Sequence, residues 1–93
     1  MNKVEQMFIK KGIRRGGIIL YSKKDALEFI KECSKYEVEV LGIDGFFITN
    51  TTTQPCLEDS VDFSTSSFAN VYEKAIEFLE NRKSDLYFEI VCE

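Results

Sequence analysis

The densest apolar run of the chain, residues 38–49 (VEVLGIDGFFIT), is interrupted at its centre by Asp44-Gly45. Asp-Gly is among the best sequences for a two-residue type I′ hairpin turn, because both central residues of that turn need positive φ angles. Alternatively, the run is one strand, either regular or with a bulge at Gly45. We favour the continuous or bulged strand, because a hairpin at this point would leave the residues that follow without a role.

The flanking segments carry one further helix pattern and two strand patterns. Gly17–Tyr21 is a short apolar run typical of a strand that is buried on both faces. Ser22 then fits the N-cap of a helix that ends near Tyr36. After the central run, residues 50–55 are rich in hydroxyl and amide side chains and are expected to form a loop. Residues 57–63 offer a short strand.

The last third of the chain gives the clearest helix pattern. Residues 64–67 supply good N-caps, and basic residues at 82–83 suit the C-terminal end of a helix dipole. The apolar positions between them follow helical spacing: Phe68, Val71, Tyr72, Ala75, Ile76 and Leu79. Residues 85–92 then alternate between apolar and mixed positions, which predicts a final strand with one buried face.

The order of these elements predicts an α+β fold. A strand, helix, strand, strand, helix, strand order (βαββαβ, the ferredoxin-like order) gives a two-layer sandwich with both helices on one face of a small sheet. The alternative is a more parallel βαβαβ sheet, which follows if residues 57–63 are irregular. Residues 1–93 are expected to form a single α/β domain. Residues 1–12 fit a helical turn or two, a short edge strand or a frayed lead-in.

The chain carries no signature of catalysis or of a cofactor. It has no His, and it contains neither a P-loop nor a G-x-S-x-G or G-x-G-x-x-G sequence. Its three cysteines match no metal-ligand spacing and are expected to be free, with Cys33 and Cys92 in the core. The absence of an apolar leader and of a membrane-length apolar run favours a cytoplasmic location. We therefore expect no enzyme activity, no cofactor and no metal.

Charge is distributed unevenly along the chain. Residues 1–35 carry nine basic and four acidic side chains, whereas residues 36–72 carry six acidic side chains and no Lys or Arg. Such an acidic block repels nucleic acid and suits a basic protein partner, although a solvated surface has the same composition.

The predicted partner-binding residues lie within this acidic block. Its carboxylates near the polar loop are Glu58, Asp59 and Asp62, and Asp44 lies in the apolar run. Phe46 and Phe47 cannot both face a one-sided core if they share a strand, so one of them is expected to be an exposed aromatic anchor beside Asp44.

The layout of the central segment resembles that of a known class of proteins. It consists of LGIDGF (41–46), TQP (53–55), LED (57–59) and DFS (62–64) in a small acidic chain. In these features the chain resembles the small cytoplasmic immunity proteins of bacterial toxin–immunity systems, including those of contact-dependent growth inhibition. The resemblance implies a non-enzymatic protein that binds and neutralises a toxin domain, often a basic nuclease, and that needs neither nucleic acid nor membrane.

Two other functions are compatible with the sequence. One is a small ligand-binding or regulatory domain that uses the polar loop at residues 50–55. The other is an enzyme in which Asp44 and Glu58 act as acid and base.

Overall fold

The structure of the protein is a computed structural model that describes residues 1–64 and 68–93. Its elements in chain order are α1 (Lys3–Phe8), β1 (Ile13–Arg15), β2 (Ile18–Ser22), α2 (Lys23–Lys35), β3 (Val40–Ile48), β4 (Thr53–Asp62), α3 (Phe68–Glu80) and β5 (Tyr87–Cys92).

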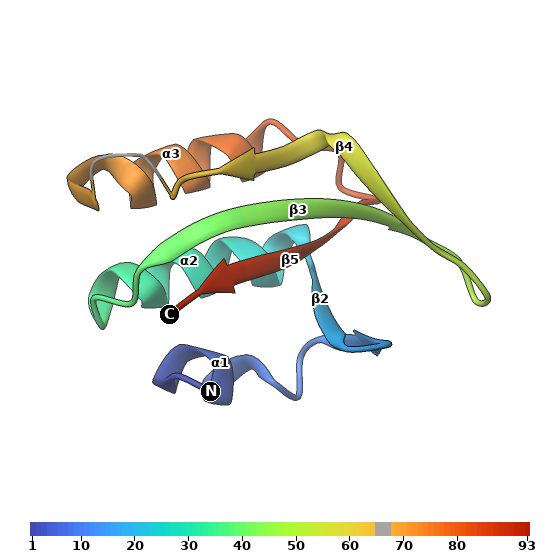
Figure 1. Cartoon of the computed structure of the whole chain (residues 1–93), viewed down its shortest axis with the longest axis horizontal. Coiled ribbons are helices and arrows are strands. Elements are labelled where there is room, and N and C mark those ends of the chain that lie inside the picture. Colours follow the sequence, from blue (N-terminus) through green and yellow to red (C-terminus); the bar gives the residue numbers. More distant parts are fainter. Residues whose placement is uncertain (65–67) are drawn as a thin grey trace.

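The strands form one sheet in the order β1-β2-β5-β3-β4 (Figure 1). Every neighbouring pair is antiparallel, so β2 and β3 run parallel to each other on either side of β5. The strand that comes last in sequence therefore lies at the centre of the sheet and joins the β1–β2 hairpin to the β3–β4 hairpin.

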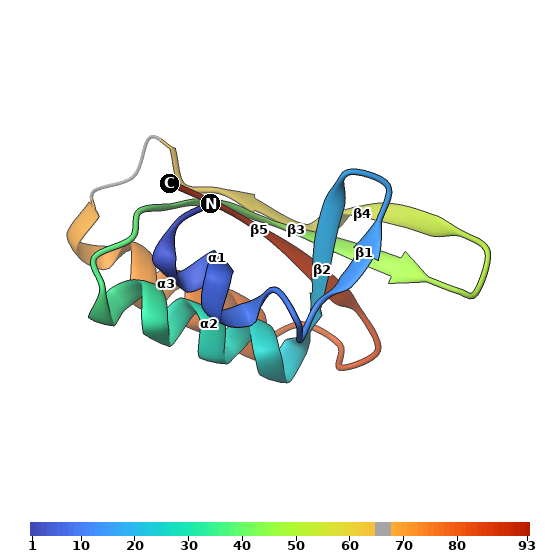
Figure 2. The same cartoon turned by 90° about the horizontal axis from the view of Figure 1, so that it is seen from below.

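All three helices lie on the same face of this sheet (Figure 2). The core fills the space between the two layers, with Phe29, Ile43 and Phe88 among its fully buried side chains. Within residues 1–64 and 68–93, no helix lies over the opposite side of the sheet, which we call the open face. Among the described residues, no helix is long and apolar enough to cross a membrane.

The predicted α+β class is confirmed, but the βαββαβ order is wrong. The structure adds α1 and β1 before the first predicted strand. Gly16 has a φ of +58°, a conformation that glycine adopts readily, and it turns the chain between β1 and β2. The basic residues Arg14 and Arg15 therefore belong to the sheet. The parallel βαβαβ alternative is also wrong, because all strand pairs are antiparallel.

The helical reading of the first residues is confirmed by α1. Asn2 and Glu5 form a reciprocal capping box, with both hydrogen bonds at 2.9 Å. Val4 and Phe8 are buried, and the Phe8 ring packs against Phe29 with 5.2 Å between ring centroids. The segment is thus part of the core rather than a frayed lead-in.

The run through Asp44-Gly45 is one strand, as favoured, and the hairpin alternative is wrong. β3 pairs with β4 on both sides of this point, but the register shifts there from Asp44↔Ser60 to Gly45↔Cys56. Residues 57–59 of β4 therefore leave the ladder, and we call them the β4 excursion. A Cβ on Gly45 would lie 2.6 Å from the backbone oxygen of Asp59. The glycine is thus required by the close approach of the excursion.

The predicted loop at residues 50–55 is only partly correct. The hairpin between β3 and β4 continues through the pair Ile48↔Thr53, so the connection is a short turn over residues 49–52. Pro55, which cannot donate to a strand ladder, lies in an edge strand opposite Phe46, where proline is tolerated. The predicted strand at residues 57–63 exists, but it starts earlier, at Thr53.

The two long helices follow their predicted patterns. Ser22 caps α2 by accepting a hydrogen bond from the Asp25 N–H at 3.2 Å. The buried stripe of α2 contains Cys33, and Cys92 packs against the same core; both are free thiols. In α3, the hydroxyl of Tyr72 donates to the Val38 carbonyl at 2.9 Å. The predicted N-cap segment at 65–67 and the side chain of Phe68 lie outside the described residues.

The contact at Gly45 leads to the first prediction. Gly45→Ala should destabilise the fold by about 1–3 kcal/mol, because the added methyl group meets backbone atoms of the β4 excursion. Urea unfolding measures the change. Gly17→Ala is the matched control, because open space surrounds that position and its change should stay below about 0.5 kcal/mol. Equal losses for the two variants would contradict the proposed contact.

The core stripe of α3 leads to the second prediction. Leu79 has 0% of its side chain exposed, whereas Ile76 is half-buried at the edge of the stripe. Leu79→Ala should therefore cost about 2–5 kcal/mol, and Ile76→Ala should cost less. Denaturant melts of both variants test the difference, and the reverse order would show that α3 is rotated relative to the sheet.

Candidate protein-binding face

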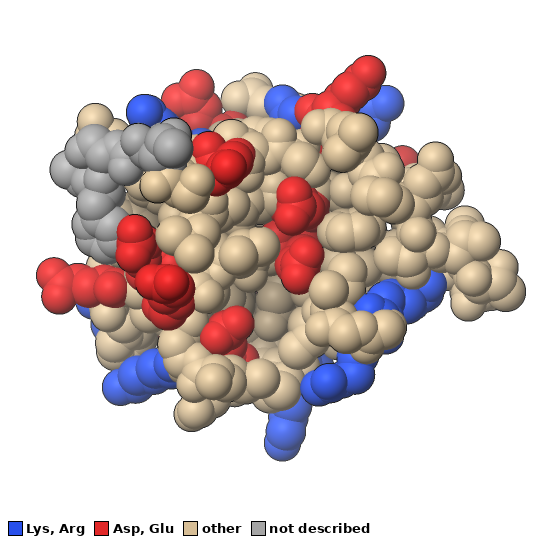
Figure 3. All heavy atoms as spheres, in the orientation of Figure 1, with Lys and Arg blue, Asp and Glu red and all other residues tan. Residues whose placement is uncertain are grey.

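Three carboxylates from three strands lie on the open face of the sheet. Asp44 of β3 and Glu89 of β5 are directly opposite each other in the β3–β5 ladder. Asp62 of β4 lies opposite Gly42, two residues before Asp44 on the same face. Figure 3, which views this side of the molecule, shows acidic side chains at its centre and basic side chains along its edges. We call Asp44, Asp62 and Glu89 the acidic sheet face.

The environments of these carboxylates differ. Burial and then the charge of Asp44 raise the pKa of Glu89 above its ordinary value. Asp62 is exposed and accepts a hydrogen bond from the Ser64 N–H at 2.8 Å, which lowers its pKa. Like charges that face each other across a strand pair destabilise a sheet, so the pair of Asp44 and Glu89 costs folding free energy.

A groove of about 300 Å³ lies beside two of these carboxylates, Asp44 and Asp62, which form part of its lining. Gly42 forms part of its lining and contributes no side chain, which leaves a hollow between its strand neighbours Asp62 and Val91. Val91 is 39% exposed, an unusual degree for a large apolar side chain in the middle strand of a sheet. The lining of the groove is therefore mixed, with two carboxylates of the acidic sheet face beside apolar side chains.

The two phenylalanines of β3 point in opposite directions. Phe46 shares the open face with Asp44 and is half-buried between its strand neighbours Tyr87 and Pro55. Phe47 is 44% exposed, but strand alternation places it on the other face of the sheet. The aromatic ring beside Asp44 is thus that of Phe46, whereas the more exposed ring is that of Phe47.

Glu58 and Asp59 do not join the acidic sheet face. Both lie in the β4 excursion, which is held by Arg82 at the end of α3. The Arg82 guanidinium donates to the Glu58 carbonyl and to the Asp59 carboxylate, both at 3.3 Å. Asp59 is therefore already paired with a basic group, and the Glu58 side chain is exposed on an edge strand. The alternative function, an enzyme, pairs Glu58 with Asp44 as acid and base. In the sheet, however, the carboxylate directly opposite Asp44 is that of Glu89.

The polar turn at residues 49–52 uses much of its hydrogen-bonding capacity internally. Its Thr49 and Thr52 hydroxyls lie 2.7 Å apart in a hydrogen bond. Arg15 of β1 reaches across the open side and donates to the Thr49 carbonyl at 2.7 Å and to the Thr52 carbonyl at 3.1 Å. These contacts connect the two hairpins, which gives the Thr-rich turn a structural role.

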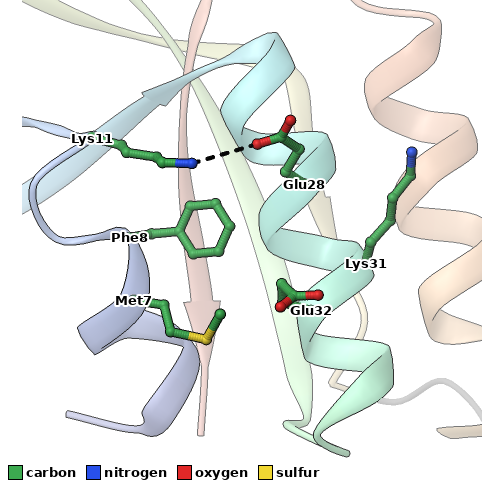
Figure 4. A pocket seen from close by; sticks show the side chains of 6 residues that line it. All are labelled: Met7, Phe8, Lys11, Glu28, Lys31 and Glu32. Carbon is green, nitrogen blue, oxygen red and sulfur yellow. Dashed lines mark ion pairs between the residues drawn. The ribbon is translucent and has the colours of Figure 1, made fainter.

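A second hollow lies between α1 and α2, away from the open face (Figure 4). Lys11 crosses over the Phe8 ring and reaches Glu28, with 3.6 Å between the charged atoms. Both charged side chains are about half exposed, and such surface pairs contribute only about 0–1 kcal/mol. Its lining combines two glutamates with two lysines, so the charges balance and we do not consider this hollow a functional site.

Sequence reasoning missed Glu89 and Val91, because both lie outside the basic-free segment. A signal for them was present in the alternation of residues 85–92, which places both on the outer side of β5. What the sequence does not reveal is that β5 pairs with β3. Only that pairing brings Glu89 opposite Asp44.

No protein-family model matches the chain, and a search of characterised proteins finds no relative. Among the residues that the structure describes, no three Cys, Asp or Glu side chains converge in a way that could hold a metal ion.

The pair of Asp44 and Glu89 leads to the third prediction. Because the folded state raises the pKa of Glu89, the folded protein binds the proton more tightly, and stability falls as pH rises from the ordinary glutamate pKa through the raised one. Glu89→Gln should remove this fall and stabilise the protein by about 0.2–1 kcal/mol at neutral pH. Urea unfolding from acidic to neutral pH tests it, and a slope identical to that of the wild type would contradict the assignment.

Proposed function

We propose that this protein is a non-enzymatic binding module that receives a basic protein surface on its acidic sheet face. The observation that carries the proposal is that Asp44 and Asp62 line the hollow at Gly42, while Glu89 lies directly opposite Asp44 on the same face. Protein interfaces commonly combine an apolar centre with a polar rim. Val91 lines this hollow, and Phe46 supplies further apolar surface on the same face.

The electrostatic state of the free protein supports this function. Within the described ranges, no ion pair joins Asp44, Asp62 or Glu89 to a Lys or Arg of the same chain. A basic partner would neutralise the repulsion between Asp44 and Glu89, which folding alone leaves in place. An acidic patch also steers a basic partner during encounter and can raise the association rate by about 10- to 1,000-fold at low salt.

The proposed partner is a basic toxin domain, and the proposed role is that of a cytoplasmic immunity protein. Support comes from the resemblance of residues 41–64 to such proteins and from the complementary charge of the open face. The alternative function, ligand binding by residues 50–55, has less support, because Arg15 and the threonines of the turn use hydrogen-bonding groups of this segment internally.

The fourth prediction tests this function by salt-dependent binding. The partner is captured from the native organism, identified by mass spectrometry, purified and titrated at low and high salt. The variant Asp44→Asn/Asp62→Asn/Glu89→Gln should associate about tenfold or more slowly at low salt. The difference should shrink at high salt, because the Debye length falls from about 10 Å at 0.1 M to about 3 Å at 1 M.

The matched control carries the same change in net charge on the helical side. Glu73, Glu77 and Glu80 are exposed on α3, so the variant in which all three become Gln should bind as the wild type does. Equal effects of the two triple variants would show that net charge alone matters and would remove the acidic sheet face from the proposal. Inhibition of the partner's activity at a one-to-one ratio separates an immunity protein from a simple adaptor.

A further inference from the structure

One leucine at the edge of the sheet is almost fully exposed. Leu57 lies in the β4 excursion and is 87% exposed, more than any other large apolar residue that the structure describes. Because β4 is an outermost strand of the sheet, the excursion stands at a free edge (Figure 1). Single apolar side chains are common on protein surfaces, and exposure alone does not make a binding site. The surroundings of Leu57 therefore decide what its exposure means.

The backbone of the excursion is held by contacts from several directions. Arg82 donates to the Glu58 carbonyl and to the Asp59 carboxylate. The Ser60 hydroxyl donates to the Cys56 carbonyl at 3.1 Å, which ties the two ends of the excursion together. The excursion also packs closely against β3, where the glycine that faces it leaves no room for a side chain. The leucine thus extends from a braced backbone, so ordering this segment at an interface costs little conformational entropy.

Protection of the sheet edge accounts for part of this arrangement but not for Leu57. Edge strands avoid pairing with other chains through proline, charged side chains and bulges. Pro55, Glu58 and the excursion itself fit that role. An exposed leucine has the opposite effect, because it adds apolar surface at an edge where association has to be prevented. Leu57 also contributes little to the core, since so little of its surface is buried.

The charges near Leu57 indicate which kind of surface covers it. Glu58 follows directly in sequence and is exposed, and within the described ranges no ion pair joins it to a Lys or Arg. Ser60, where the excursion ends, lies opposite Asp44 in the ladder, and Asp62 follows two residues later. The excursion is therefore continuous along β4 with the acidic sheet face, and both match a basic surface.

We propose that Leu57 is an anchor of the interface with the basic partner and inserts into an apolar pocket of that partner, whose rim carries Lys or Arg. The inference rests on the proposed function for the nature of the partner, and it extends the contact from the open face to the β4 edge. Interfaces obtain most of their binding energy from a few buried side chains within a polar rim. The carboxylates then determine the rate of encounter, whereas Leu57 determines the lifetime of the complex.

The fifth prediction separates these two roles by binding kinetics. Surface plasmon resonance compares the wild type and Leu57→Ser against the partner purified for the salt titration. The variant should dissociate about 10- to 100-fold faster, because burial of a leucine side chain contributes a free energy of this size. Its association rate and its urea midpoint should stay as in the wild type, since the side chain is exposed in the free protein. Met7→Ser, at an exposed apolar position on α1, is the matched control and should leave the dissociation rate unchanged.

Two results would overturn the proposal. One is an unchanged dissociation rate for Leu57→Ser. The other is sedimentation of the wild type as an oligomer that Leu57→Ser converts to a monomer, because a second copy of the chain would then cover Leu57. The triple carboxylate variant distinguishes this failure from that of the proposed function. If the triple variant slows association and Leu57→Ser changes nothing, only the anchor is wrong; if Leu57→Ser speeds dissociation and the triple variant changes nothing, only the acidic sheet face is wrong.

Discussion

The pairing of β5 with both β2 and β3 is the constraint on which the rest of the structure depends. The two hairpins of the sheet lie on either side of this strand, and no other strand connects them. Because side chains alternate between the two faces along β5, Phe88 and Ile90 point into the core, whereas Glu89 and Val91 lie on the open face. One central strand thus closes the core with Phe88 and Ile90 and creates the repulsion opposite Asp44 with Glu89.

The open face is acidic because some carboxylates of the chain are paired with a cation or a backbone N–H, whereas the carboxylates on this face are mostly left without a cation. Asp59 is paired with Arg82, and the exposed carboxylate of Asp62 is stabilised by a backbone N–H. Asp44 and Glu89 instead face each other, and no cation among the described residues forms an ion pair with either of them. A repulsive pair held on a rigid strand ladder is a costly arrangement for an isolated protein. It becomes favourable once a basic surface covers it, which links the unfavourable local contact to the proposed binding function.

Local patterns in the sequence predicted the elements better than their arrangement. The helical spacing of apolar residues from Val71 to Leu79 and the alternation of residues 85–92 identified α3 and β5, because both patterns depend on neighbours within a few residues. The neighbours of β5 could not be predicted, since pairing between distant strands leaves no local pattern. For the same reason Asp44 was recognised as a candidate and Glu89 was not. The β4 excursion was missed as well, because its contacts with Gly45 and Arg82 join residues that are distant in sequence.

The central position of β5 also has a consequence for how the chain folds. The β1–β2 and β3–β4 hairpins pair residues close in sequence, but the Tyr21↔Phe88 pair closes a loop of most of the chain. Contacts of such long range slow folding, because the entropy of loop closure is lost before the pairing compensates for it. Until β5 inserts, the backbone N–H and C=O groups on the facing edges of β2 and β3 are unpaired. Such edges can pair with a strand of another chain, which leads to aggregation. A β5 strand from a second molecule satisfies the same hydrogen bonds, so strand exchange is the characteristic error of this topology at high protein concentration.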